Sequence, residues 1–339
     1  MRALVFEGPD RLVLRDWPTP RPEPGGIVIR VMAAAICATD LRIVSGRKTR
    51  DVRVGHPIGH ECAGVVAAVG EGVSGLAAGD RVSVCVVVSC GQCRWCRADR
   101  ENLCAHRRTL GYHTDGCFAD YMPVPRQAVE RGNVFRLPEG VSFETAALLE
   151  PLACCLNGQR ELGLTGSDSV VIFGAGPIGL LHMLLAKQQG CRRVVMVEPR
   201  PRRRECALRM GATEAWDPAG FGAVDEFDAA ILAVGVPESV PRALAAVAPC
   251  GRVNLFAGFA AGAIASIDPN LIHYKQLVVT GASESRRRDY ADSLELVRSG
   301  RLDPAPLVTH RFDLSEHRAA FAVAADGSGL KVVFVARTE

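Results

Sequence analysis

The chain has 339 residues, of which 48 % are hydrophobic and 23 % are charged. This composition is typical of a globular protein, and the length allows two domains. The formal net charge of +3 is too small and too evenly spread to predict binding to nucleic acid or to a membrane. No apolar run reaches transmembrane length, and the charged, alternating N-terminus predicts a strand rather than a signal peptide.

The first third of the chain has a β pattern. Short apolar runs, such as Ile27–Val31, Cys62–Val69 and Arg81–Val88, are separated by Gly, Pro and Asp. Closely spaced glycines between residues 55 and 79 favour tight turns. The pattern therefore predicts a small β-barrel.

Four cysteines with the spacing C-x2-C-x2-C-x7-C lie within this region: Cys90, Cys93, Cys96 and Cys104. Four thiolates on closely spaced turns can surround one zinc ion tetrahedrally and leave no position for water or substrate. We therefore predict a structural zinc site in a lobe of about residues 88–106; disulfides or an iron–sulfur cluster are the alternatives. Reduced thiols at a zinc site are consistent with a cytoplasmic location.

After about Glu150, strands alternate with helices. The predicted strands are Ser169–Phe173, Arg193–Glu198, Phe227–Val234, Arg252–Phe256 and Leu277–Thr280, and the first two helices are Ile178–Gln189 and Arg202–Met210. Such alternation predicts an α/β domain with a doubly wound parallel sheet. The last part of the chain predicts helices Tyr290–Ser299 and Glu316–Ala325 and a final strand Val332–Val335, which we expect to return to the first domain.

A dinucleotide-binding turn follows the first of these parallel strands. The run Gly174-Ala175-Gly176-Pro177-Ile178-Gly179 has the G-x-G-x-x-G spacing and opens a predicted helix, whose free N–H groups suit a pyrophosphate. Glu198 ends the next strand about 20 residues later, where a carboxylate binds ribose hydroxyls and disfavours a 2′-phosphate. We therefore predict NAD. The nearby arginines leave NADP open, and we select Arg203 among them as a cofactor contact.

A second set of metal ligands is formed by Cys37, His60 and Glu61. One thiolate, one imidazole and carboxylates can hold a zinc ion that keeps a position open and acts as a Lewis acid on an alcohol oxygen. Asp40 is a candidate partner for the ring of His60, and the Thr39 hydroxyl is a candidate proton relay. Core packing is the alternative for each residue taken singly.

Together these motifs resemble the zinc-dependent medium-chain dehydrogenases of the alcohol and polyol dehydrogenase superfamily, and the resemblance runs essentially end to end. It implies a GroES-like catalytic barrel at 1–151 that is completed by 284–339, a Rossmann domain at 152–283, and a catalytic zinc in the cleft between them. Two zinc ions per chain and a homodimer or homotetramer are also implied. Glu150, in Glu150-Pro151-Leu152, resembles a zinc ligand of the sorbitol and threonine dehydrogenase branch; the alternative is an acid capping a helix at Leu152–Gln159.

The resemblance predicts reversible oxidation of a secondary alcohol to a ketone with hydride transfer to NAD. A polyol, sugar alcohol, cyclitol or aminocyclitol is the expected small-molecule substrate. The alternatives are a threonine-type amino-alcohol dehydrogenase and an NADP-dependent ketone or aldehyde reductase; the intact metal ligands argue against a non-catalytic nucleotide-binding protein. Substrate-lining residues are expected from residues 45–53, which are basic, 112–114 and 270–274. His56 is expected to join the proton relay or to be an ordinary loop residue, and Lys331 to reach the cofactor phosphates or to be solvated.

Overall fold

The computed structural model describes residues 1–222 and 226–336. The chain divides into two compact units, one formed by Met1–Ala153 with the chain from Ser285 onward, and the other by Cys154–Glu284. Helix α5 (Leu149–Leu162) contains the first boundary. Within the described ranges, no helix has both the length and the apolar character needed to cross a membrane.

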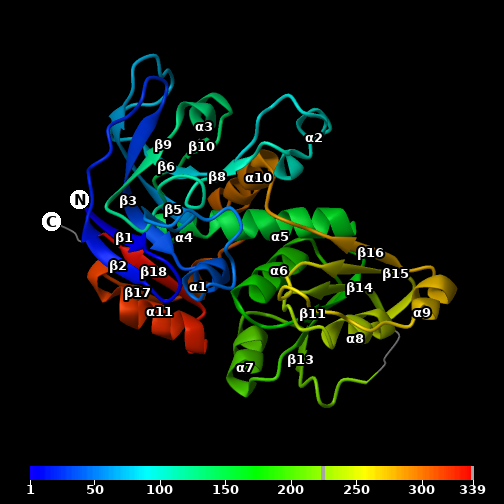
Figure 1. The fold of residues 1–339 in the computed structure, drawn as a ribbon. Helices are drawn as coiled ribbons and strands as arrows, with labels where there is room; N and C mark the ends of the chain where they lie inside the picture. The colour runs from blue at the N-terminus through cyan, green and yellow to red at the C-terminus, as the bar shows by residue number, and fades with distance from the viewer. Residues whose placement is uncertain (223–225, 337–339) are drawn as a thin grey trace. The chain divides into compact units, whose positions relative to one another are not determined.

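A seven-stranded sheet with the path β10-β6-β5-β3-β18-β17, in which β9 also pairs with β3, dominates the first unit. Strand β18 (Lys331–Val335), near the end of the chain, pairs antiparallel with β3 (Ile27–Ala35), so the red and blue ribbons lie side by side in Figure 1. The other strands of this sheet are β5 (Glu61–Val69), β6 (Arg81–Val84), β9 (Tyr121–Val124), β10 (Val134–Arg136) and β17 (Val308–Phe312).

Smaller elements complete this unit. A three-stranded sheet has the order β2-β1-β4, and β7 pairs with β8. Their bounds are β1 Arg2–Phe6, β2 Leu12–Asp16, β4 His56–Pro57, β7 Val87–Val88 and β8 Arg108–Thr109. The helices are α1 Ala38–Val44, α2 Arg94–Arg97, α3 Arg126–Glu130, α4 Phe143–Ala147, α10 Arg287–Arg298 and α11 His317–Asp326, with 3-10 turns at Glu101–Leu103, Ala305–Leu307 and Leu314–Glu316.

The core of the first unit forms where β3 and β5 pack under the surrounding strands and loops. Ile27, Ile29 and Phe118 are at most 1 % exposed and belong to one apolar cluster. Because β3 is buried along almost its whole length, its end at Ala35 is fixed in position. The residues that follow, including Cys37, therefore start from a rigid strand.

The second unit contains a six-stranded parallel sheet with the order β13-β12-β11-β14-β15-β16. Numbered within this unit the order is 3-2-1-4-5-6, the arrangement of a Rossmann fold, so the predicted doubly wound sheet is confirmed. The strands are β11 Ser169–Phe173, β12 Arg193–Val197, β13 Glu214–Trp216, β14 Phe227–Leu232, β15 Val247–Leu255 and β16 Val278–Gly281. The helices are α6 Pro177–Gln188, α7 Pro201–Arg209, α8 Ser239–Ala246 and α9 Pro269–Lys275.

Several element boundaries differ from the predicted ones. Helices α6 and α7 each begin at a proline, because the first helical position needs no N–H donor. The predicted strand at 81–88 is two strands, since the backbone N–H of Cys85 turns to donate to the carbonyl of Asn133. Helix α5 begins at Leu149, so Glu150 lies inside its first turn and does not precede the helix as a cap.

Candidate functional site

Cys37, His60 and Glu61 come together in the first unit, with one potential ligand atom of each lying within 4.8 Å of the others. Cys37 is the N-cap residue of α1, two positions after the end of β3. Glu61 starts β5 and lies opposite Ala35 in the antiparallel ladder, and His60 directly precedes it. Paired strand ends thus place a thiol, an imidazole and a carboxylate at one point.

Asp40 fixes two of these residues. One of its carboxylate oxygens, Oδ2, accepts a hydrogen bond of 2.8 Å from the backbone N–H of Cys37. The other, Oδ1, lies 3.2 Å from Nδ1 of His60, which is within ion-pair distance although the alignment falls outside a hydrogen bond. Because Nδ1 faces the fully buried Asp40, the Nε2 atom of His60 is the one available as a metal ligand.

Glu61 is held by a buried lysine. The Lys331 ammonium forms an ion pair with Oε2 of Glu61 and donates to the carbonyl of Ile36 at 3.4 Å. Burial lowers the pKa of Lys331, but the charges of Glu61 and Cys37 outweigh this and leave the pKa above its ordinary value. Lys331 is 3 % exposed, so the prediction of a solvated lysine is wrong. The error arises because β18 is buried from Lys331 to Phe334, and the buried lysine meets a carboxylate that is distant in sequence.

The three-residue group has the chemistry of a zinc site. It offers sulfur, nitrogen and oxygen donors, a mixture that zinc accepts. The Oε1 atom of Glu61 is buried and has no hydrogen-bond partner in the described part of the chain, which leaves it available to a cation. These residues therefore fit a zinc ion.

The geometry of this group does not test the roles of two other predicted members of the site. The group found among the described residues does not include Glu150, and its role as a ligand stays a prediction. Thr39 lies in the first turn of α1 and is partly exposed, so its role in proton transfer also stays a prediction. His56 is engaged elsewhere: its Nδ1 lies 2.8 Å from a carboxylate oxygen of Asp115, and its Nε2 lies 2.7 Å from the guanidinium of Arg53.

Tyr112, in the predicted substrate-lining segment 112–114, contacts the metal-ligand group. Its hydroxyl lies 3.5 Å from Nε2 of His60, and the two rings meet edge to face with centroids 5.1 Å apart. The preceding Gly111 permits this contact, because a Cβ there would lie 2.1 Å from the carbonyl oxygen of Gly59. A glycine followed by an aromatic residue does not by itself predict a contact with His60, which is evident only in the folded structure.

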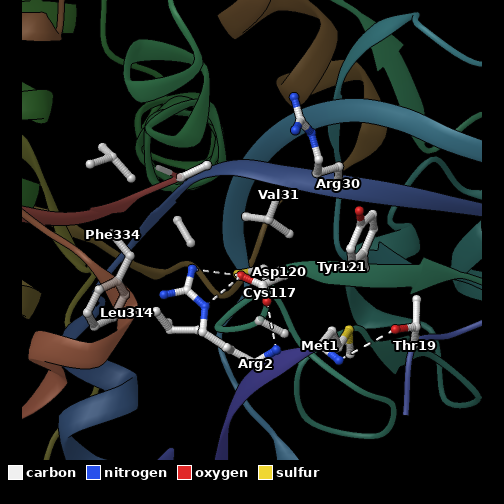
Figure 2. Close-up of a pocket in the computed structure, with 14 residues that line it drawn as sticks. Met1, Arg2, Thr19, Arg30, Val31, Cys117, Asp120, Tyr121, Leu314 and Phe334 are labelled. Carbon is white, nitrogen blue, oxygen red and sulfur yellow. Dashed lines mark hydrogen bonds and ion pairs between the residues drawn. The ribbon is translucent and has the colours of Figure 1, made fainter. Parts of the chain in front are cut away.

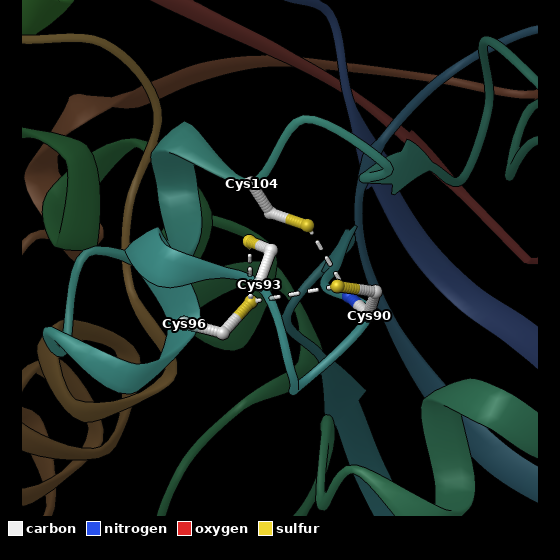
Figure 3. A group of neighbouring side chains, drawn as sticks. All are labelled: Cys90, Cys93, Cys96 and Cys104. Atoms are coloured by element: carbon white, nitrogen blue, oxygen red, sulfur yellow. Dashed lines mark hydrogen bonds between the residues drawn. The ribbon is translucent and has the colours of Figure 1, made fainter.

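The four-cysteine lobe forms a separate cluster in the first unit, and Figure 3 shows the sulfur atoms converging. Sγ of Cys96 lies 3.5 Å from Sγ of Cys93 and 3.9 Å from Sγ of Cys90. Around a tetrahedral zinc ion with zinc–sulfur bonds of about 2.3 Å, neighbouring sulfur atoms are expected to lie about 3.8 Å apart, which is close to these separations. The separations are much longer than the sulfur–sulfur bond of a disulfide. A hydrogen bond from the backbone N–H of Cys96 lowers the pKa of Cys93 to about 6, which favours the thiolate that zinc requires. The lobe fits a structural zinc ion.

In the second unit, the glycine-rich turn has the form that a dinucleotide requires. Gly174 has φ +100, and a Cβ on Gly179 would lie 1.8 Å from the carbonyl oxygen of Gly174. The carboxylate of Glu198 accepts hydrogen bonds of 2.8 Å from the N–H of Ala175 and of 3.0 Å from the N–H of Arg200. Glu198 therefore ties the phosphate-binding turn to the end of β12.

The helix beyond this turn presents its N-terminus to the same place. Gly176 is the N-cap residue of α6, Pro177 is its first residue and Ile178 follows. The guanidinium of Arg203 lies 3.7 Å from the position that a Cβ on Gly176 would occupy. Burial, followed by the nearby charge of Arg200, lowers the pKa of Arg203. Arg203 is thus next to the phosphate-binding turn, where an anionic group would stabilise its charge.

A cavity of about 480 Å³ lies elsewhere in the first unit (Figure 2). Arg2 at its wall donates to the carboxylate of Asp120, while Leu314 and Phe334 supply apolar surface. None of its lining residues belongs to the metal-ligand group or to the cysteine lobe. The candidate chemistry is therefore not located in this cavity.

Comparison with known proteins places these features in one family. Residues 23–137 match the alcohol dehydrogenase GroES-like domain and residues 177–299 match the zinc-binding dehydrogenase family. An L-threonine 3-dehydrogenase of Pyrococcus abyssi is 36 % identical over 93 % of this chain and 92 % of its own length. The chain belongs to the zinc-dependent medium-chain dehydrogenases. The predicted family and the predicted combination of a GroES-like and a Rossmann domain are confirmed, as is an enzyme that uses zinc and a nicotinamide cofactor.

Solved structures of other members of the family are closely similar. A zinc-binding dehydrogenase of Sinorhizobium meliloti 1021, bound to NADP, has a TM-score of 0.92 at 29 % identity and 99 % coverage of both chains. The 2R,3R-butanediol dehydrogenase of Bacillus subtilis has a TM-score of 0.89 at 26 % identity, again with 99 % coverage of both chains. These medium-chain dehydrogenases share the complete two-unit architecture of this chain.

Proposed function

We propose that this dehydrogenase reversibly oxidises a secondary alcohol to a ketone, with hydride transfer to NAD. The observation that carries the proposal is the group of Cys37, His60 and Glu61, whose ligand atoms lie within 4.8 Å of one another. A zinc ion bound there would supply Lewis-acid activation of the alcohol oxygen, and the bound nicotinamide would accept the hydride.

The residues of the chain would position these components and transfer the proton. Cys37, through the N-cap position of α1, and His60, through Asp40, are held before any ion binds, so little reorganisation is needed. Glu61 adds a third ligand from Oε1 while its other oxygen is held by Lys331. We assign the proton relay to the Thr39 hydroxyl, which is near Cys37 and partly exposed, and keep Glu150 as a further candidate ligand.

The preference for NAD is a proposal that depends on Glu198. Its buried carboxylate lies at the end of β12 beside the glycine-rich turn, where a 2′-phosphate would meet like charge. Arg203 is the contrary feature, since its guanidinium could bind that phosphate. We assign Glu198 the greater weight because its carboxylate is fixed by two backbone N–H groups.

We propose a substrate whose reacting carbon has a polar neighbour. The names of two relatives describe such alcohols, since L-threonine has an amine next to its hydroxyl-bearing carbon and 2,3-butanediol has a second hydroxyl there. Polyols, cyclitols and aminocyclitols share this chemistry. We therefore retain both the polyol and the threonine-type substrates.

A screen of secondary alcohols tests the proposal directly. Purified zinc-containing protein should reduce NAD, and NADP less well, in the presence of at least one polyol, cyclitol or amino alcohol. Cys37→Ala should abolish this activity because it removes the thiolate ligand, whereas Cys206→Ala, in the partly exposed helix α7, should retain it. Full activity of Cys37→Ala would refute the mechanism.

We also propose a cellular location and an oligomeric state for the enzyme. None of the thirteen cysteines forms a disulfide, which agrees with a cytoplasmic protein. We propose a homodimer or homotetramer on the basis of the family alone, and sedimentation of the purified protein would distinguish these states from a monomer.

A further inference from the structure

Tyr112 contacts the metal-ligand group through His60, yet it is not itself a ligand. Its hydroxyl is 3.5 Å from Nε2 of His60, the nitrogen that faces away from Asp40. A tyrosine hydroxyl is ordinarily protonated at neutral pH, with a reference pKa of about 10, and can donate a hydrogen bond.

Metal binding would change the partner of this hydroxyl. In the structure, Nε2 of His60 is the acceptor within reach of the Tyr112 O–H. A nitrogen that binds a cation uses its lone pair for that bond and no longer accepts a hydrogen bond. The half-buried hydroxyl would then need another acceptor close to the ligand group, and a substrate bound at the metal would be near enough to supply it.

Lys48 determines which acceptor suits this position best. Its ammonium lies 4.9 Å from the centroid of the Tyr112 ring and donates to the carbonyl of Arg50 at 3.3 Å. The loop is also attached to Tyr112 by its backbone, since the N–H of Arg53 donates to the carbonyl of Tyr112 at 3.1 Å. A cation over the ring draws electron density from the phenol and creates a positive potential, and both effects favour an anionic oxygen over a neutral one.

We propose that Tyr112 is a specificity-determining residue whose hydroxyl donates a hydrogen bond to an oxygen of a substituent on the carbon next to the reacting alcohol carbon. The preferred substrates are then secondary alcohols with a neighbouring carboxylate, followed by those with a neighbouring hydroxyl. This inference depends on the proposed function and narrows its substrate class.

Three four-carbon alcohols provide the test, because they differ in the substituents on the carbon next to the reacting one: 2-butanol has no oxygen-containing group there, 2,3-butanediol has a hydroxyl and 3-hydroxybutanoate has a carboxylate. In the zinc-containing enzyme, kcat/KM should rise in that order, with about tenfold or more between the first compound and the last, because only the last two compounds offer an acceptor to the Tyr112 hydroxyl. Tyr112→Phe should lower the values for the last two compounds about tenfold and leave 2-butanol nearly unchanged. Lys48→Met should chiefly reduce the amount by which kcat/KM for 3-hydroxybutanoate exceeds that for 2,3-butanediol.

Two controls separate this role from a structural one. Tyr121→Phe removes a tyrosine hydroxyl from β9 in the same unit and should leave the kcat/KM values for the three alcohols unchanged. Zinc content should be equal in the wild type and in Tyr112→Phe, and saturation-transfer NMR on the cofactor-free enzyme should show weaker binding of 3-hydroxybutanoate to the variant.

The possible failures are distinguishable. If Tyr112→Phe lowers kcat/KM equally for all three alcohols, or if the wild type does not discriminate among them, the inference is overturned while the proposed function stands. If the zinc-containing enzyme oxidises none of the three with either cofactor and 3-hydroxybutanoate does not bind, the inference is overturned, and the broader alcohol screen decides the proposed function separately.

Discussion

At the scale of single residues, the metal-ligand group depends on a charge that is balanced inside the protein. Glu61 is fully buried, and Lys331 provides the cation that compensates its carboxylate. Removing one partner of a buried ion pair leaves an uncompensated charge, whereas removing both charges is often nearly neutral. The same contact holds one oxygen of Glu61 and leaves the other free, which defines how this residue can approach a metal.

The Lys331–Glu61 pair can be tested by a double-mutant cycle. In chelator-treated protein, Lys331→Met should lower the free energy of unfolding by about 3 kcal/mol, because the buried carboxylate loses its cation. Adding Glu61→Gln should restore most of this loss, since a neutral amide needs no counter-ion. Urea unfolding of the wild type, both single variants and the double variant measures the coupling. Additive losses would show that the two side chains do not form a pair.

At the scale of elements, helices α5 and α6 of the second unit share a buried polar contact. His182 on α6 is fully buried, its Nδ1 lies 3.3 Å from the side-chain amide nitrogen of Gln159 on α5, and its ring packs edge-on against Phe256. The amide also donates to the backbone carbonyl of His182 at 2.8 Å. Burial lowers the pKa of His182 to about 3, so this histidine is neutral in the folded protein.

This neutral histidine predicts a loss of stability in acid. Its pKa is about 6.5 in the unfolded chain and about 3 in the fold, so between these values the unfolded state binds the extra proton. Stability is therefore complete above about pH 6.5 and falls by up to about 1.4 kcal/mol per pH unit below it. Urea unfolding at pH 7.5 and pH 5 measures the decrease in the free energy of unfolding on acidification. This decrease should be smaller in His182→Gln than in the wild type.

The matched control for this effect is His273→Gln, because His273 is exposed on α9 of the same unit. In this variant the free energy of unfolding should decrease between pH 7.5 and pH 5 by as much as in the wild type. Equal decreases in the wild type and in His182→Gln would contradict the assignment of this effect to the buried neutral His182.

At the scale of the whole molecule, the sequence predicts well what local spacing determines. The glycine turn between β11 and α6 and the four-cysteine spacing are short-range patterns whose geometry follows from a few consecutive residues. The parallel sheet follows because apolar strands alternate with helices. Element ends are predicted less well, as the start of α5 before Glu150 shows, because tertiary packing extends helices beyond their local signals.

The contacts that were not predicted join residues that are distant in sequence. Lys331 and Glu61 are separated by 270 positions and meet only because β18 joins the sheet beside β3. Tyr112 reaches His60 because two loops approach through glycines, which periodicity does not reveal. A charge or an aromatic ring in a strand or loop has many possible partners, and only the assembled fold selects one.

The central claim is that Cys37, His60 and Glu61 bind a metal ion distinct from that of the cysteine lobe, and zinc content per chain tests it most directly. The purified wild type should contain two zinc ions per chain, His60→Ala should contain one, and Cys93→Ser should also contain one. The double variant should contain none. A single zinc ion in the wild type that is lost in Cys93→Ser and retained in His60→Ala would contradict the account.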